Sequence, residues 1–237
     1  DASKNNNWTK ADAELAKVQQ YQKTWGKTVI PDESKINIEV LLNTLNLNFY
    51  LLIFYTLIGG LLIVLGFIEL FKPNKILHKI IKIIIYIGVV GYVLHFLGLI
   101  ARWYISGHAP WSNAYESIIY VAWATMFFGL AFDRKSKLTV ASSAFVSAMI
   151  LTAAYANWID PQIANLQPVL NSYWLMIHVA VIVASYGPFA LGFILGCVSL
   201  ILMLFTNKEN KNKMELNIKE LTYINEMALT VGLVMLT

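Results

Sequence analysis

Three of the four histidines, one arginine and a tryptophan are the residues whose types and spacing could support chemistry. They are His95, His108 and His178, with Arg102 seven residues after His95 and Trp111 three residues after His108. These residues make a poor site for hydrolysis or for zinc, which takes three or four ligands with Cys or acidic partners. They suit a flat, apolar iron macrocycle that carries two carboxylates. Histidine can bind the iron axially, aromatic rings can stack on the ring, and arginine can pair with a propionate. The residues therefore suggest a haem site.

Each residue also has a structural explanation. A neutral imidazole hydrogen-bonded to a neighbouring helix would account for His95 or His108, although ionisable residues inside spans are functional candidates by default. Tryptophan is common at membrane interfaces. Three tryptophans at the borders of outward loops fit that explanation, namely Trp103, Trp158 and Trp174. Trp111, in the middle of a polar turn, does not fit it, whereas His78, among lysines, is interpreted as a solvated surface residue.

The composition decides what kind of fold must position these residues. Of the 237 residues 57% are hydrophobic and 14% are charged, against about 25% charged in soluble domains. The hydrophobic residues cluster into runs near the length of about 20 residues that spans a bilayer. The runs are 49–71, 83–101, 117–132, 138–155 and 175–205, and a sixth begins near Met227. This pattern excludes a soluble domain and a disordered chain. It predicts an all-α, polytopic transmembrane helix bundle with about six spans.

The polar segment before the first span forms a separate part of the chain. Residues 1–48 are expected to face outward and to contain an amphipathic helix at 8–25, with a break at Pro31. Residues 49–237 form the transmembrane module. Pro188 lies near the middle of the fifth run, which is too long for an untilted span, so we expect a kink or a protrusion there.

The positions of the basic residues predict the orientation. They gather in the connections after the first, third and fifth spans, as Lys72, Lys75, Lys79, Lys82, Arg134, Lys135, Lys137, Lys208, Lys211, Lys213 and Lys219. The alternate loops, residues 102–116 and 156–174, contain a single Lys or Arg residue, which is Arg102. Because loops rich in Lys and Arg stay cytoplasmic, loops 102–116 and 156–174 are expected to face outward. The net charge of +4 therefore reports topology and gives no reason to expect a nucleic-acid partner. Glu69, near the inner end of the first span, can pair with Lys72 at i+3, so it needs no functional explanation.

Other sequence features narrow the possibilities. Cys197 is the only cysteine, so the chain has neither a disulfide framework nor a CxxC pair. It contains no P-loop, no HExxH and no GxGxxG after a strand. The chain starts at Asp1 and stops at Thr237 inside an apolar run, so it is interpreted as an internal piece of a longer polypeptide.

Two stretches together resemble the CcsA/ResC family, the haem-handling subunits of the system II cytochrome c synthase. They read GLIARWYISGHAPWSNAYESIIYVAW (98–123) and SYWLMIHVAVIVASYGPFALGF (172–193). The polar lead-in resembles the middle of fused CcsB–CcsA proteins. The resemblance implies that His178 is the first of two external histidines flanking a tryptophan-rich WWD segment, and hence an axial ligand of haem iron. The WWD segment would follow Thr237, so the module is expected to be truncated before it.

The resemblance also implies an activity and its surroundings. The protein would hold haem b at the outer membrane face for thioether attachment to the CxxCH motif of an apocytochrome c. The substrate's thiols supply the nucleophiles, so no catalytic residue is expected here. Expected partners are the apocytochrome, a CcsB-type domain or subunit and the lipid bilayer, in a bacterial inner membrane with the functional loops in the periplasm. The alternatives are a haem exporter or other polytopic carrier without ligation chemistry, and a structural membrane subunit.

Overall fold

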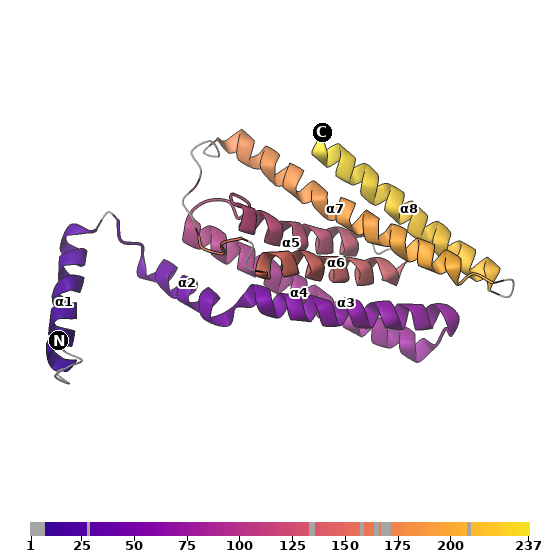
Figure 1. Cartoon of the computed structure of the whole chain (residues 1–237), viewed down its shortest axis with the longest axis horizontal. Coiled ribbons are helices and arrows are strands. Elements are labelled where there is room, and N and C mark those ends of the chain that lie inside the picture. The colour runs from indigo at the N-terminus through magenta and orange to yellow at the C-terminus, as the bar shows by residue number, and fades with distance from the viewer. Residues whose placement is uncertain are drawn as a thin grey trace.

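The computed structural model describes residues 8–27, 29–132, 136–156, 159–163, 166, 172–207 and 210–237, except for the side chain of Lys213. This part of the chain contains eight α-helices and no strand (Figure 1). In chain order they are α1 Trp8–Trp25, α2 Glu33–Leu45, α3 Leu47–Phe71, α4 Lys75–Ser106, α5 Ala114–Phe132, α6 Lys137–Tyr155, α7 Tyr173–Leu204 and α8 Lys211–Leu236. The all-α prediction is confirmed.

Five of these helices, α3 to α7, are long and apolar enough to cross a membrane. They correspond to the first five predicted spans. The sixth predicted run, from Met227, forms the last turns of α8, whose first turns are polar and begin at Lys211. Among the described residues the structure therefore has five candidate spans, with α8 as a sixth long helix of mixed polarity.

Two of the spans are longer than the apolar runs that predicted them. α4 begins at Lys75 rather than near residue 83, and it has 32 residues. α7 also has 32 residues and stays helical through Pro188. At 1.5 Å per residue each measures about 48 Å, whereas the hydrocarbon core of a bilayer is about 30 Å thick. Both helices are thus long enough for their ends to extend beyond that core, as the length of the fifth run suggested for α7.

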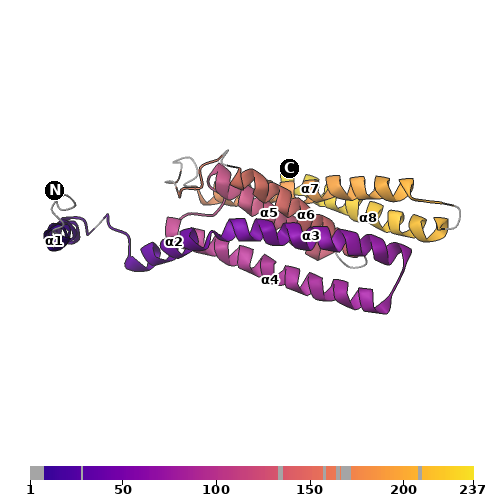
Figure 2. The ribbon, with the colours of Figure 1, turned by 60° about the horizontal axis from the view of Figure 1, so that its bottom comes forward.

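α6 is the centre of the bundle, where it packs against α3, α5 and α7 (Figure 2). Two thirds of its most apolar stretch is buried, against one third for α3 and α4. Small side chains such as Ala141, Ala144 and Ala148 let α3 and α5 approach closely. A Cβ at Gly59 of α3 would lie only 2.6 Å from the backbone nitrogen of Phe145, so α3 and α6 meet backbone to backbone there.

α7 and α8 form an antiparallel hairpin that packs onto α5 through α7. Leu191, Leu195 and Leu202 of α7 and Leu221 of α8 belong to its apolar core, which is separate from the core around α6. In Figure 1 this hairpin (orange and yellow) lies along one side of the α3–α6 group.

The alternating direction of the helices gives the bundle two different ends. The α4–α5 connection, residues 159–163 and the first turns of α7 lie at one end, which we call the loop end. The α3–α4 turn, the start of α6 and the α7–α8 turn lie at the other, which we call the lysine-rich end. The predicted outward and cytoplasmic loops thus lie at opposite ends of the molecule.

The N-terminal helices extend from the loop end. α1 matches the predicted helix at 8–25 and lies away from the bundle (Figures 1 and 2). α2 packs on α4, where Ser34 Oγ and Tyr104 Oη are 3.0 Å apart. A single residue, Asn46, joins α2 to α3, with left-handed backbone angles φ 44° and ψ 48°.

Candidate functional site

A buried ion pair organises the loop end. Glu116, in the first turn of α5, has no solvent exposure, and its Oε1 lies 3.6 Å from Nη2 of Arg102 near the end of α4. Its Oε2 accepts a hydrogen bond from the backbone N–H of Ser112 at 3.3 Å and lies 3.9 Å from Nδ1 of His108. Glu116 therefore connects α4, the α4–α5 loop and α5 through one carboxylate.

Arg102 makes further contacts inside the protein. Its Nη2 donates a hydrogen bond to the carbonyl oxygen of Pro161 at 3.1 Å, and its guanidinium carbon lies 5.0 Å from the centroid of the Tyr115 ring. The side chain is 12% exposed. The end of α4 is thus held to Pro161 in the connection between α6 and α7, and the Arg102 charge already faces Glu116. Pairing of Arg102 with a haem propionate stays a prediction.

The α4–α5 loop has the backbone features of a tight, fixed connection. α4 ends at Ser106 and is followed by the capping residue Gly107, whose positive φ of 74° suits glycine. Asn113 precedes α5, and its Oδ1 accepts a hydrogen bond from the backbone N–H of Glu116 at 2.8 Å, as a helix-capping side chain does. His108 is 9% exposed, and its Nδ1 lies 3.3 Å from the carbonyl oxygen of Ala109.

Trp111 connects this loop to α7. Its indole Nε1–H donates to the carbonyl oxygen of Met176 at 3.2 Å, two residues before His178. The Trp111 ring contacts Trp103 and Tyr120, with centroid distances of 6.4 and 4.9 Å. The Trp in the middle of the polar turn thus fixes the position of the loop against the helix that carries His178.

His178 lies exposed near the loop end of α7. Within the described part of the chain, its ring has no hydrogen-bond or ion-pair partner. Trp174, one turn toward the loop end, is 77% exposed, and Val181, almost one turn deeper, is 41% exposed. The imidazole therefore stands between an exposed indole and an exposed aliphatic side chain, where a flat apolar ligand could reach it.

His95 has a different environment. It is 1% exposed in α4, and its Nδ1 lies 3.5 Å from the hydroxyl oxygen of Tyr55 in α3. The two rings also contact each other, with centroids 5.9 Å apart. In this arrangement His95 serves helix packing, the structural explanation considered above. Contact of His95 or of His108 with haem stays a prediction.

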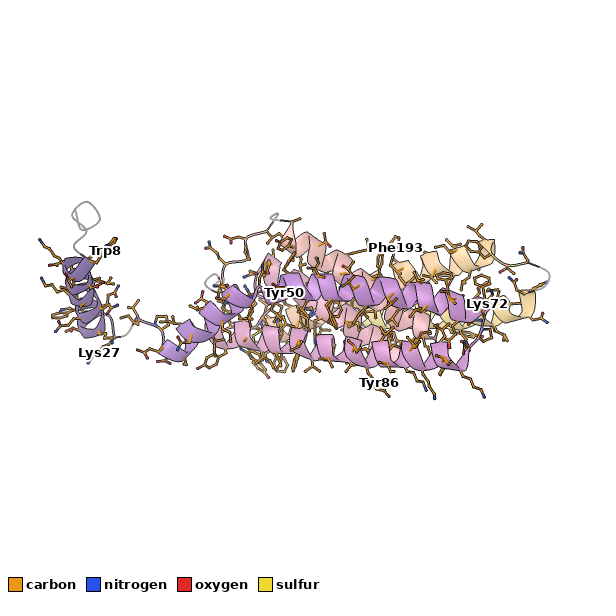
Figure 3. The ribbon with its side chains drawn as sticks, turned by 90° about the horizontal axis from the view of Figure 1, so that it is seen from below. Trp8, Lys27, Tyr50, Lys72, Tyr86 and Phe193 are labelled. Atoms are coloured by element: carbon orange, nitrogen blue, oxygen red, sulfur yellow. The ribbon has the colours of Figure 1, made fainter. Side chains whose placement is uncertain are left out.

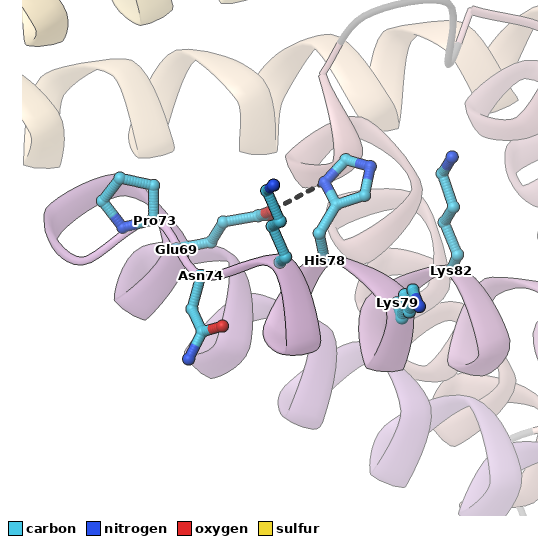
Figure 4. Close-up of a pocket in the computed structure, with 7 residues that line it drawn as sticks. Glu69, Pro73, Asn74, His78, Lys79 and Lys82 are labelled. Atoms are coloured by element: carbon cyan, nitrogen blue, oxygen red, sulfur yellow. Dashed lines mark hydrogen bonds and ion pairs between the residues drawn. The ribbon is translucent and has the colours of Figure 1, made fainter.

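The lysine-rich end holds the fourth histidine. His78 Nδ1 lies 2.8 Å from Oε1 of Glu69 (Figure 4). Lys137 Nζ lies 3.4 Å from each carboxylate oxygen of Glu69 and also contacts the His78 ring. The predicted pairing of Glu69 with Lys72 is wrong, because partners from α4 and α6 occupy the carboxylate instead. His78 is about half exposed, so it is a surface residue that is also hydrogen-bonded.

The structure thus gathers part of the predicted site. Arg102 and His108 meet at Glu116, and Trp111 of the same loop contacts the α7 segment that carries His178. His95 lies about 10 Å of helix rise below Arg102, and Trp158 lies outside the described residues. Sequence reasoning did not single out Glu116. The sequence does contain a signal for Glu116. Residues 102–116 hold one acidic residue, Glu116, and one Lys or Arg residue, Arg102, so the two could be expected to pair.

Comparison with known proteins gives consistent matches. Residues 111–237 match the family model described as "Cytochrome C assembly protein". Protein NrfI of Wolinella succinogenes is 40% identical over 223 residues, which cover 94% of this chain and 24% of NrfI. Cytochrome c biogenesis protein CcsA of Prochlorococcus marinus (strain AS9601) is 33% identical over 167 residues, covering 69% of this chain and 50% of CcsA. CcsA of Lobularia maritima is 34% identical over 154 residues, which cover 57% of this chain and 47% of that CcsA. The chain thus spans about a quarter of NrfI and about half of these CcsA proteins.

Proposed function

Because the chain belongs to the cytochrome c assembly protein family, we propose that it is the part of a membrane cytochrome c synthase that holds haem. In this proposal haem lies at the loop end of the bundle and is presented there for thioether attachment to the CxxCH motif of an apocytochrome c. Membership of the family supports a role in cytochrome c biogenesis. The remaining steps concern what this chain's own residues would do.

The observation that carries the proposal is the exposed, unpartnered imidazole of His178 among the described residues. An axial haem ligand needs a nitrogen lone pair that no neighbouring side chain occupies. Trp174 stands beside it with most of its surface open, and so offers a ring face to a porphyrin. Neither of the other histidines at this end or in the adjoining span, His95 and His108, is as accessible.

The proposed reaction needs positioning more than it needs a catalytic side chain. Each cysteine thiol of CxxCH adds across a haem vinyl group: a sulfur–carbon bond forms and the thiol proton is transferred to the other vinyl carbon. The protein's contribution is to hold the ring still and in reach of the peptide. The Glu116 cluster and the Trp111–Met176 hydrogen bond suit that task, because they fix the loop next to the segment that carries His178.

The surroundings are part of the same proposal. We place the loop end in the periplasm and the lysine-rich end in the cytoplasm of a bacterial inner membrane, because the basic residues gather at the latter. A CcsB-type domain or subunit, apocytochrome c and haem b are the proposed partners and substrate. The resemblance to fused CcsB–CcsA proteins and the polar helices α1 and α2 ahead of the bundle support the first of these.

Haem retention by a histidine variant tests the site. With His178→Ala in the full-length protein, we expect co-purified haem to fall severalfold, and added imidazole to restore part of it by occupying the vacated ligand position. His78→Ala, which removes an imidazole at the opposite end, is the control and should keep its haem. Unchanged haem content and an unchanged absorption spectrum in His178→Ala would contradict the assignment.

Two further measurements test whether the protein attaches haem covalently and whether Arg102 belongs to the haem site. Complementation of a synthase-deficient strain should yield haem that stays attached to cytochrome c after denaturation; haem export without thioether product would indicate a carrier instead. Arg102→Gln with haem retention intact would remove Arg102 from the haem site and leave it as the partner of Glu116.

A further inference from the structure

We propose that the turn between α3 and α4 forms a binding site for the phosphate headgroup of an anionic phospholipid. The site is a hollow of about 490 Å³ at the lysine-rich end, and Lys75, Lys79 and Lys82 of α4 form the part of its lining that we call the rim. Figure 4 shows Lys79 and Lys82 beside Glu69 and His78. Figure 3 shows the neighbouring Lys72 at this end of the molecule, where α3 turns into α4. This inference does not depend on the haem proposal.

The charges in the hollow favour an anion. Its one acidic residue, Glu69, is already engaged by His78 and by Lys137, whose Nζ lies 3.4 Å from both carboxylate oxygens. The three lysines of the rim are exposed and have no ion-pair partner within the described ranges. They recur at i, i+4 and i+7, so they lie on one face of α4. The hollow therefore presents three uncompensated positive charges in a row.

The position along α4 favours a lipid. α4 is about 48 Å long and exceeds the hydrocarbon core, so its first turns lie at headgroup level if its apolar part spans the core. The lysines of α4 end at Lys82, and apolar side chains beyond it are exposed, with Ile83 58%, Ile87 47% and Val90 58% exposed. A phosphate held by Lys79 and Lys82 would leave its acyl chains beside these residues.

A second hollow on the same turn has the same mixed character. It measures about 850 Å³ and shares Lys75 with the first, and its wall contains Ile68, Ile76 and Ile80 beside Lys72. A free phosphate ion would use only the lysines, whereas a phospholipid would also cover this apolar wall. The combination of unpaired cations with adjoining apolar surface is the pattern of a basic lipid-headgroup pocket at a bundle end.

The experiment measures lipid selectivity. The full-length protein is reconstituted in nanodiscs of equal parts phosphatidylglycerol and phosphatidylcholine, and the lipids that it retains are counted by native mass spectrometry. We expect preferential retention of phosphatidylglycerol, and about a tenfold fall in that preference in Lys79→Gln/Lys82→Gln, since each lysine near an anionic surface strengthens binding severalfold. Lys79→Arg/Lys82→Arg keeps the charges and should keep the preference.

The control removes two charges elsewhere at the same end. Lys211→Gln/Lys219→Gln alters exposed lysines of α8 and should leave the preference unchanged. An equal loss in this control, or no loss in Lys79→Gln/Lys82→Gln, would overturn the proposal. Displacement of phosphatidylglycerol by soluble glycerol phosphate at comparable concentration would also overturn it, because it would show a site for free phosphate. Thermal unfolding of all variants confirms that each is folded.

Discussion

At the scale of single residues, the chemistry-bearing side chains divide by exposure. His178 is exposed and unpartnered within the described ranges, whereas His95 and the Arg102–Glu116 pair are buried among neighbouring helices. Their types were readable from the sequence, but their roles were not. The sequence does not distinguish a histidine that is buried in helix packing from one that is exposed. Only the neighbours on other helices, such as Tyr55 beside His95, make that distinction.

Glu116 allows a prediction about stability. Glu116→Ala leaves the guanidinium of Arg102 buried without its counter-charge, so we expect a loss of about 3 kcal/mol in the free energy of unfolding. Glu116→Gln, which can still accept the hydrogen bond from Ser112, should lose less. Thermal unfolding in detergent measures both.

The matched control for Glu116 is Glu39 of α2, which is exposed. Glu39→Ala removes the same group at the surface and should change stability by less than about 0.5 kcal/mol. If Glu116→Ala were no more destabilised than Glu39→Ala, the ion pair would have no part in holding the loop end.

At the scale of elements, the first five apolar runs each correspond to one of the five candidate spans, in the same order. The first run ends at Phe71, as α3 does. They misplaced the start of α4, since hydropathy marks the part of a helix that suits the membrane and not the helix itself. The Glu69–Lys72 pairing failed for a related reason. Spacing within one segment cannot show that α6 brings Lys137 alongside.

Two adjacent glycines of α3 test how closely its backbone approaches α6. A Cβ at Gly59 would lie 2.6 Å from the backbone nitrogen of Phe145, whereas a Cβ at Gly60 meets nothing within 4 Å. We expect Gly59→Ala to destabilise the protein by about 1–3 kcal/mol through overpacking. Gly60→Ala should be neutral or stabilising by up to about 1 kcal/mol, because alanine is the better helix former.

The measurement is the difference in melting temperature between Gly59→Ala and Gly60→Ala, which each add one methyl group at neighbouring positions. Membrane insertion and helix propensity affect both alike, so the difference isolates the contact with α6. Equal melting temperatures would show that α3 and α6 do not meet as closely as 2.6 Å implies.

At the scale of the whole molecule, the bundle has two chemically different ends. The residues predicted for haem lie at or near the loop end, and the lysines of the α3–α4 turn and of the starts of α6 and α8 lie at the other, whereas the lysines of α1 and α2 lie on the side of the loop end. Loop charge alone was enough to sort the connections into two groups. It could not show that the α4–α5 loop is fixed to residues 159–163 and to α7, because the Arg102–Pro161 and Trp111–Met176 hydrogen bonds join segments far apart in the sequence.

Cysteine labelling tests which end faces the periplasm. In a Cys197→Ala background, Asn37→Cys on α2 and Lys72→Cys at the α3–α4 turn place one exposed thiol at each end. A membrane-impermeant maleimide added to spheroplasts should label the first directly and the second only after permeabilisation. The reverse pattern would invert the proposed orientation, and with it the side on which haem is presented.

The junction at Asn46 has a mechanical consequence. α2 and α3 are joined with no intervening loop, so the angle between an extramembrane helix and a membrane span is set by the backbone of one left-handed residue. Asparagine tolerates that conformation and a β-branched residue does not. We therefore expect that a partner binding to α2 would change the orientation of α3 directly, and through the Gly59 contact would act on the backbone of α6.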